Sequence, residues 1–195
     1  TDQKVNKVHI DNRNLLWLAT NKGIVKSSGD GGTFQEYLTN LYFSSVTTDN
    51  KNRVWAGGNN YVYNVETGVN YPLPVPDAVI SCIAYYDNQV WVGSNKGLFV
   101  LNPSTAKFKI VNTSNSKLPN NQVNFLHADQ NKILWIGTDG GYVRLDNEKW
   151  EVQDKKYKML ATCENKEGQW IISNQDMFLI NKFNRLFPVK LDPNQ

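Results

Sequence analysis

The stretch Asn131-Lys132-Ile133-Leu134-Trp135-Ile136-Gly137-Thr138-Asp139-Gly140-Gly141-Tyr142-Val143-Arg144-Leu145-Asp146 holds two apolar runs joined by a polar turn. Its first run is one of five similar segments, each centred on a tryptophan. They are Leu16-Trp17-Leu18-Ala19-Thr20, Val54-Trp55-Ala56-Gly57-Gly58, Val90-Trp91-Val92-Gly93-Ser94, Leu134-Trp135-Ile136-Gly137-Thr138 and Gln169-Trp170-Ile171-Ile172-Ser173. Successive tryptophans of this set lie 38, 36, 44 and 35 residues apart. Self-similarity at a period of about 20 to 50 residues marks a repeat architecture, so the chain is predicted to contain five repeats.

Two more positions recur with each tryptophan. Six residues before it stand Asp11, Asp49, Tyr85, Asp129 and Glu164, and four residues after it stand Asn21, Asn59, Asn95, Asp139 and Asn174. The acidic residues directly precede a turn, where an aspartate caps the turn through its own side chain. We favour this interpretation over a ring of carboxylates that binds a cation.

Each repeat is predicted to form four short strands, because its apolar runs are about five residues long and end at turn residues. In the third repeat the strands are residues 79–85, 89–93, 97–101 and 108–111. Strands two and three are apolar on both faces, which requires a sheet that is covered on both sides. We therefore predict an all-β fold, a β-propeller built of five four-stranded antiparallel blades, with the five tryptophans buried at equivalent positions between blades.

The propeller is expected to be a single region, residues 1–195, with repeats at about 1–39, 40–76, 77–119, 120–155 and 156–195. The first repeat starts at strand one and the fifth ends after strand four. No strand from one end of the chain is therefore left to complete a blade at the other end. We expect closure to rest on blade faces alone. Apolar faces left open on the end blades are expected to self-associate.

Composition excludes several classes of protein. Hydrophobic residues make up 40% and charged residues 20%, and no apolar run approaches the roughly 18 residues of a membrane span. The net charge of +3 comes from 21 basic and 18 acidic residues without a clustered basic face, so no nucleic-acid partner is expected. Two cysteines make no disulfide framework and no zinc-binding spacing. We expect no metal and no cofactor.

No catalytic constellation is recognisable, and the chain is predicted not to be an enzyme. No serine, cysteine or threonine has a base at a familiar spacing. His9 and His127 both stand eight residues before a tryptophan, on strands that line a propeller's channel, where a facing pair could bind a metal or move a proton. Because Thr47, Ile83 and Thr162 stand at the same offset from the tryptophan in the other repeats, we favour the interpretation that His9 and His127 are two unrelated strand residues.

The stretch 131–146 resembles the two-component regulator propeller repeat, and residues 112–123, with the core Leu118-Pro119-Asn120, are similar to that family's connection between blades. The resemblance covers almost the whole chain. It implies the periplasmic sensor of a hybrid two-component signalling protein, usually with seven-bladed propellers, and glycan fragments as ligands. Five repeats are fewer than seven, and Ile172 stands where the repeat has glycine. A five-bladed ring and a part of a larger seven-bladed propeller both remain open.

Ligand contacts are expected on the face formed by the turns between strands two and three. The first candidates there are Lys22, Asn59, Tyr61, Lys96 and Asp139. Amides, lysines and tyrosines round a central depression suit the hydroxyl groups and rings of an oligosaccharide. The alternative is a protein-interaction or assembly scaffold without a small-molecule ligand, which would expose an apolar patch instead.

Overall fold

The computed structural model describes residues 3–28, 32–154, 158–165, 168–174, 177–181 and 186–189. All regular structure within these residues is β-strand, arranged as five antiparallel sheets that each use four consecutive strands. The strands are β1 (Val5–Ile10), β2 (Leu16–Thr20), β3 (Gly23–Ser27), β4 (Phe34–Tyr37), β5 (Ser45–Thr48), β6 (Val54–Gly58), β7 (Tyr61–Asn64), β8 (Asn70–Pro72), β9 (Ile80–Tyr86), β10 (Gln89–Ser94), β11 (Gly97–Asn102), β12 (Lys107–Val111), β13 (Val123–Ala128), β14 (Ile133–Thr138), β15 (Gly141–Asp146), β16 (Lys149–Asp154), β17 (Met159–Asn165), β18 (Gly168–Ser173), β19 (Met177–Asn181) and β20 (Leu186–Val189).

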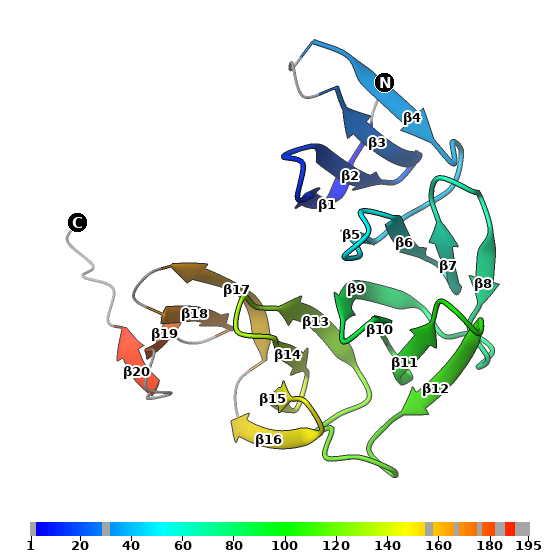
Figure 1. The fold of residues 1–195 in the computed structure, drawn as a ribbon. Helices are drawn as coiled ribbons and strands as arrows, with labels where there is room; N and C mark the ends of the chain where they lie inside the picture. Colours follow the sequence, from blue (N-terminus) through cyan, green and yellow to red (C-terminus); the bar gives the residue numbers. More distant parts are fainter. Residues whose placement is uncertain are drawn as a thin grey trace.

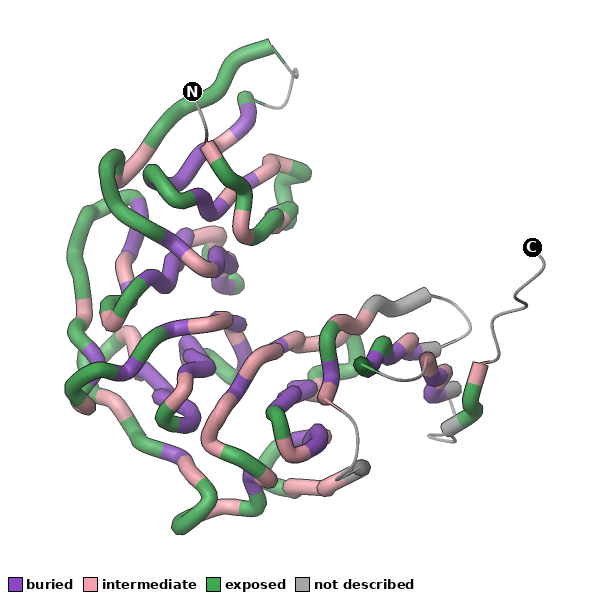
Figure 2. The backbone as a smooth tube through the Cα atoms, turned by 180° about the vertical axis from the view of Figure 1, so that it is seen from behind, coloured by how far each residue is buried: buried purple, intermediate pink, exposed green. Residues whose placement is uncertain are grey.

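The five sheets are the blades of a β-propeller, as the sequence predicts. They follow one another along an arc, with the first strand of each blade on its concave side (Figure 1). The blade β1–β4 and the blade β17–β20 lie at the two ends of the arc, with an opening between them in both views (Figures 1 and 2). The five blades therefore form an open arc and do not close into a ring.

Neighbouring blades pack in the same way at each interface. In one interface, Trp17 and Ile24 of the first blade form one buried cluster with Val46, Val54 and Ala56 of the second. Three further apolar clusters repeat this arrangement along the arc, with Trp55, Trp91 and Trp135 each among their members. The tryptophan face of one blade thus packs on the aliphatic face of the next. The buried segments lie mainly on the middle strands of the blades, and the outer strands β4, β8 and β12 are mostly exposed (Figure 2).

The burial of the tryptophans follows from this packing. Trp17, Trp55, Trp91 and Trp135 are 0%, 1%, 8% and 1% exposed. Trp170 is only half-buried, because its face belongs to the last blade and no blade follows it in the arc. The expectation of five equal tryptophan environments is correct for four positions and wrong for the fifth.

The acidic position of the repeat caps a turn and also bonds to the tryptophan. Asp11 accepts hydrogen bonds from the backbone N–H groups of Arg13 and Leu15, at 2.8 and 3.0 Å, and from the Trp17 indole at 3.2 Å. The Asp49 and Asp129 carboxylates bond to the indoles of their tryptophans at 3.2 and 2.9 Å. The turn interpretation is confirmed for these three residues, while the side chain of Glu164 lies outside the described part.

The third blade departs from this pattern because its first turn is shorter. Tyr86 pairs with Gln89, so Tyr86, and not Tyr85, occupies the place that an aspartate takes in the first, second and fourth blades. The Tyr86 hydroxyl bonds to Leu145 O and Asn147 N instead, at 3.4 and 3.0 Å. Within the described residues, the buried indole nitrogen of Trp91 has no hydrogen-bond partner.

Candidate functional site

A pocket of about 630 Å³ lies on the concave side of the arc. The first strands of four blades line it, and its lining residues are 7–10, 12, 46–50, 83–85 and 126–128. These residues form the later part of each first strand and the turn that follows. The pocket therefore opens at the end of the blades where strands one and two are joined.

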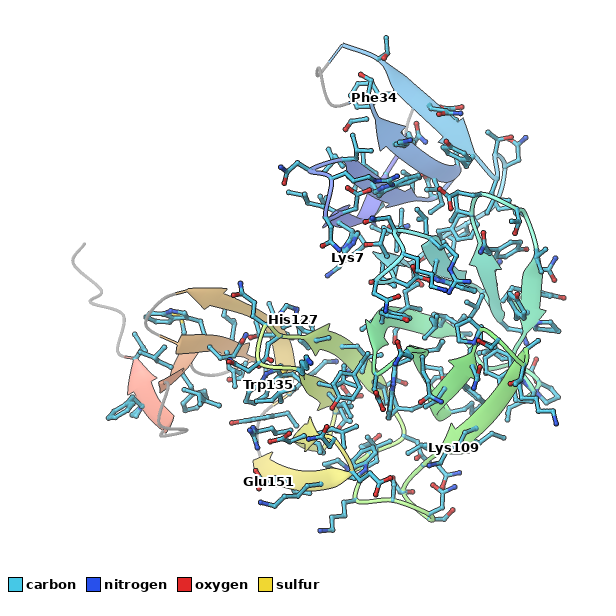
Figure 3. The ribbon with its side chains drawn as sticks, viewed as in Figure 1. Lys7, Phe34, Lys109, His127, Trp135 and Glu151 are labelled. Atoms are coloured by element: carbon cyan, nitrogen blue, oxygen red, sulfur yellow. The ribbon has the colours of Figure 1, made fainter. Side chains whose placement is uncertain are left out.

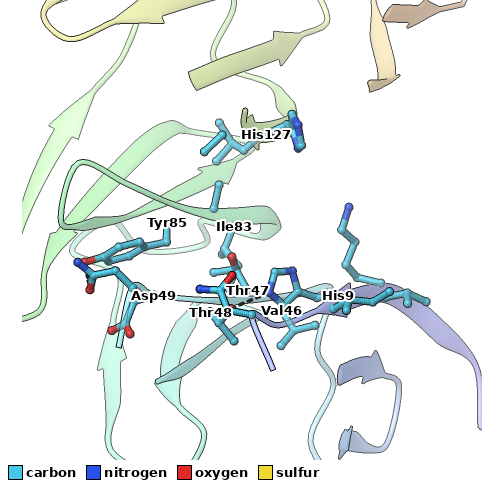
Figure 4. A pocket seen from close by; sticks show the side chains of 16 residues that line it. His9, Val46, Thr47, Thr48, Asp49, Ile83, Tyr85 and His127 are labelled. Atoms are coloured by element: carbon cyan, nitrogen blue, oxygen red, sulfur yellow. Dashed lines mark hydrogen bonds between the residues drawn. The ribbon is translucent and has the colours of Figure 1, made fainter. Parts of the chain in front are cut away.

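Strand register decides which side chains the blades present here. The residues that pair with the four buried tryptophans are His9, Thr47, Ala84 and His127. The sequence offset indicates Ile83 as the equivalent of His127 in the third blade. The strand register shows that the equivalent is Ala84. Figure 4 shows His9 and His127 on different walls of the pocket, one on the first blade and the other on the fourth.

His9 is held by a neighbouring blade. A hydrogen bond of 2.8 Å joins His9 Nε2 and Thr48 Oγ1 (Figure 4). Burial lowers the pKa of the His9 imidazole below its ordinary value; the Asp11 carboxylate opposes this shift and the charge of Lys7 adds to it. Burial thus favours the neutral form of His9.

Lys7 and His127 lie on opposite sides of the concavity (Figure 3). Lys7 is exposed and makes no ion pair within the described residues. His127 is half-buried, with its ring 6.4 Å from that of Phe125. The two side chains leave room for a ligand between them, because both line the same pocket.

A second pocket, of about 390 Å³, adjoins the first. The two share Asn50, Tyr85 and Ala128. The Tyr85 hydroxyl lies 3.3 Å from Asn50 Oδ1 and 3.4 Å from Asn88 Oδ1, so these two amides hold the phenol in place. Burial raises the pKa of Tyr85, which keeps it a neutral hydrogen-bonding group.

The five residues predicted from the sequence lie at the opposite end of the blades. Lys22, Asn59, Lys96 and Asp139 belong to the turns between strands two and three, and Tyr61 is the first residue of β7. They come from four blades and line neither of the two pockets. Tyr61 is 39% exposed and its ring is 6.1 Å from that of Tyr63.

Asp139 has partners on two blades. Its Oδ1 accepts hydrogen bonds from Asn124 Nδ2 and Lys158 Nζ, both at 2.8 Å. The bond from Lys158 lowers the pKa of Asp139. Asp139 thus joins the fourth blade to the start of the fifth.

Asparagines at the equivalent turn position have a structural role that the sequence did not reveal. The side-chain oxygens of Asn21, Asn95 and Asn174 accept the backbone N–H groups at the start of strand one of their own blades, at 2.8, 2.8 and 3.1 Å. These amides fix where the innermost strand begins. Asn59, with φ at 50°, is in the left-handed conformation that asparagine tolerates.

Comparison with known proteins gives a match within the fourth repeat and its preceding connection. The two component regulator propeller family matches residues 117–140. This confirms the resemblance to the propeller repeat in that segment. No curated protein sequence matches the chain.

Solved structures share the fold over nearly the whole chain. The extracellular domain of BT4673 from B. thetaiotaomicron, assigned as a one component system, is 18% identical with a TM-score of 0.76, over 97% of this chain and 28% of that one. The extracellular domain of BT3049 from B. thetaiotaomicron, assigned as a hybrid two component system, is 17% identical with a TM-score of 0.76, over 98% and 29%. The chain thus spans under a third of the length of these domains.

An enzyme shares the same fold. Inactive H270A virginiamycin B lyase from Staphylococcus aureus, solved with quinupristin, is 15% identical with a TM-score of 0.77, over 99% of this chain and 72% of that one. At these identities the comparisons show the β-propeller fold. No described segment is a helix with the length and apolar character that a bilayer crossing requires. The described residues also contain no cluster of three or more histidine, cysteine, aspartate or glutamate side chains suited to a metal.

Proposed function

We propose that this chain is an extracytoplasmic ligand-sensing module of a two-component signalling protein, that it recognises glycan fragments, and that it catalyses no reaction itself. One observation carries the proposal. A two-component regulator propeller repeat, residues 117–140, is part of a chain whose fold matches extracellular domains assigned to one component and hybrid two component systems. The same comparison supports an extracytoplasmic location, and we propose that this location is the periplasm.

The glycan contacts in this proposal come from the turns between strands two and three, with Lys22, Asn59, Tyr61, Lys96 and Asp139 as the contacting residues. Lys22, Asn59 and Lys96 are exposed, and so is the Tyr61 ring. Amide and ammonium groups donate hydrogen bonds to sugar hydroxyls, and a tyrosine ring packs on the apolar face of a sugar. Asp139 offers acceptor oxygens in the same set of turns.

Titration calorimetry against cello-, xylo-, manno- and galacto-oligosaccharides tests the proposal. At least one sugar should give heat and be recovered unchanged. Tyr61→Ala and Lys96→Ala should each weaken binding by about 1 to 3 kcal/mol with the melting temperature unchanged. Lys109→Ala, a matched change on the outer strand β12 (Figure 3), should leave binding as it is. Absence of heat for every sugar, or equal effects of the Lys96 and Lys109 changes, contradicts the proposal.

A second candidate function is assembly through the end blades, and the exposed faces of the arc favour it. On the first blade Val8, Ile10 and Phe34 are 51%, 62% and 60% exposed. By strand register they occupy the places of Ile83, Tyr85 and Phe108, which pack against the second blade in the interior of the arc.

The last blade ends in the complementary face. Ile172 and Phe187 are 41% and 45% exposed beside the half-buried Trp170. A second copy could place its Val8 face on this Trp170 face, in the manner of each interior interface. Sedimentation should then show association that grows with concentration and is abolished by Ile10→Lys or by Ile172→Lys. A monomer at every concentration would rule this candidate out.

A further inference from the structure

The pocket on the concave side of the arc is built where the blades depart from their common pattern. Among the four residues that pair with the buried tryptophans, two are histidines. Tyr85 takes the place that Thr48 and Ala128 have on the neighbouring blades, because each pairs with the residue before the tryptophan. Local departures from a structural pattern concentrate at functional sites.

The charges at this pocket are unbalanced. The Asp49 carboxylate, which lines the pocket, is paired with Arg53 at 2.6 Å, and that of Asp11 in the first blade is paired with Arg13 at 2.7 Å. Lys7 has no such partner among the described residues and lies close enough to His9 to lower its pKa. A ligand in the first pocket therefore meets the Lys7 ammonium and the imidazoles of His9 and His127.

The shape suits a small polar molecule. Volumes of about 630 and 390 Å³ lie in the usual range of small-molecule sites, roughly 300 to 1,000 Å³. The Tyr85 phenol and the Asn50 amide lie where the two pockets meet, and the amide contacts the phenol hydroxyl. A ligand lying along both pockets would meet the Lys7 ammonium and the two imidazoles in the first pocket and hydroxyl-binding groups at the junction.

We propose that this pocket binds a small polyhydroxylated ligand that carries an anionic oxygen group, a carboxylate or a sulfate, with the anionic group between Lys7 and His127 and the hydroxyl groups at Asn50 and Tyr85. The site lies at the opposite end of the blades from the turns assigned to neutral glycans, so it goes beyond the proposed function. Lys7 supplies the fixed charge. The histidines supply N–H donors, His9 being oriented by Thr48.

The two histidines of the chain both line this pocket, so their imidazole NMR signals report on it directly. His9→Gln and His127→Gln assign the two signals. Sodium glucuronate should shift both signals in a saturable way, whereas glucose at equal concentration should not. Sodium sulfate tests whether the anionic group is recognised without a sugar. If sulfate shifts the signals, the anion alone is recognised. If glucuronate shifts them and sulfate does not, the sugar is also needed.

A matched pair of lysine variants completes the test. Lys7→Gln should weaken glucuronate binding about tenfold or more, the loss expected for one charge-assisted hydrogen bond. Lys109→Gln, on the exposed outer strand β12, should bind as the parent chain does. Equal shifts with glucose and glucuronate, no shift with any of the three probes, or equal affinities of the two variants would overturn the proposal.

Discussion

Replacing Asp11 by asparagine tests whether the acidic residue of the repeat stabilises the fold. The Asp11 side chain is fully buried, and it accepts hydrogen bonds from Arg13, Leu15 and Trp17. Burial alone would raise the pKa of Asp11, but the bonds from these residues outweigh it and lower the pKa from 3.8 to about 2. That difference corresponds to about 2 kcal/mol of folding free energy.

The pH dependence follows from the sign of this difference. Because the pKa is lower in the folded chain, the contribution is fully present above about pH 5, falls to about half near pH 3 and is lost as the pH falls through about 2. Urea unfolding should therefore show Asp11→Asn less stable than the parent by about 2 kcal/mol at pH 7 and by about 1 kcal/mol at pH 3.

The control is Asp87→Asn, which removes the same charge from an exposed turn of the third blade. This change should alter the unfolding free energy by no more than about 0.5 kcal/mol. The reasoning is refuted if the two variants lose equal stability at pH 7, or if the deficit of Asp11→Asn is the same at pH 7 and pH 3.

Three further changes test the packing. Trp135→Ala should lower the free energy of unfolding by about 3 to 5 kcal/mol, and Trp170→Ala should lower it clearly less, because only Trp135 is enclosed between two blades. Equal losses in thermal or urea unfolding would contradict the arc. Gly58→Ala would place a Cβ atom 1.9 Å from Tyr42 O, whereas the Cβ atom of Gly68→Ala meets nothing within 4 Å. Gly58→Ala should therefore lower the melting temperature far more than Gly68→Ala does. A melting temperature for Gly58→Ala at or above that of Gly68→Ala would be evidence against the packing. Asn95→Ala leaves the Val79 N–H without its acceptor and should cost about 1 kcal/mol in urea unfolding, with an unchanged value as the contrary result.

The repeat period predicts the blades well because every blade must solve the same local problem. A tryptophan flanked by aliphatic residues needs apolar cover on both faces, and the turn residues fix where each strand ends. The capping role of Asp11, Asp49 and Asp129 follows from sequence because it depends on neighbours two to six residues away.

Sequence offsets fail where turn length changes. The first turn of the third blade is shorter, so counting back from Trp91 assigns Tyr85 and Ile83 to places that Tyr86 and Ala84 occupy in the strand register. The exposed face of Trp170 and the concave pocket depend on how whole blades are placed relative to one another. No local pattern contains that information, so Lys7 and Tyr85 were not predicted as pocket residues.

The most direct test of ligand sensing is a crystal structure of the chain with the oligosaccharide that gives the largest heat. We predict that the sugar lies over the turns between strands two and three and contacts Tyr61 or Lys96. A sugar bound only along the outer strands β4, β8, β12 and β16, away from those turns, would contradict it.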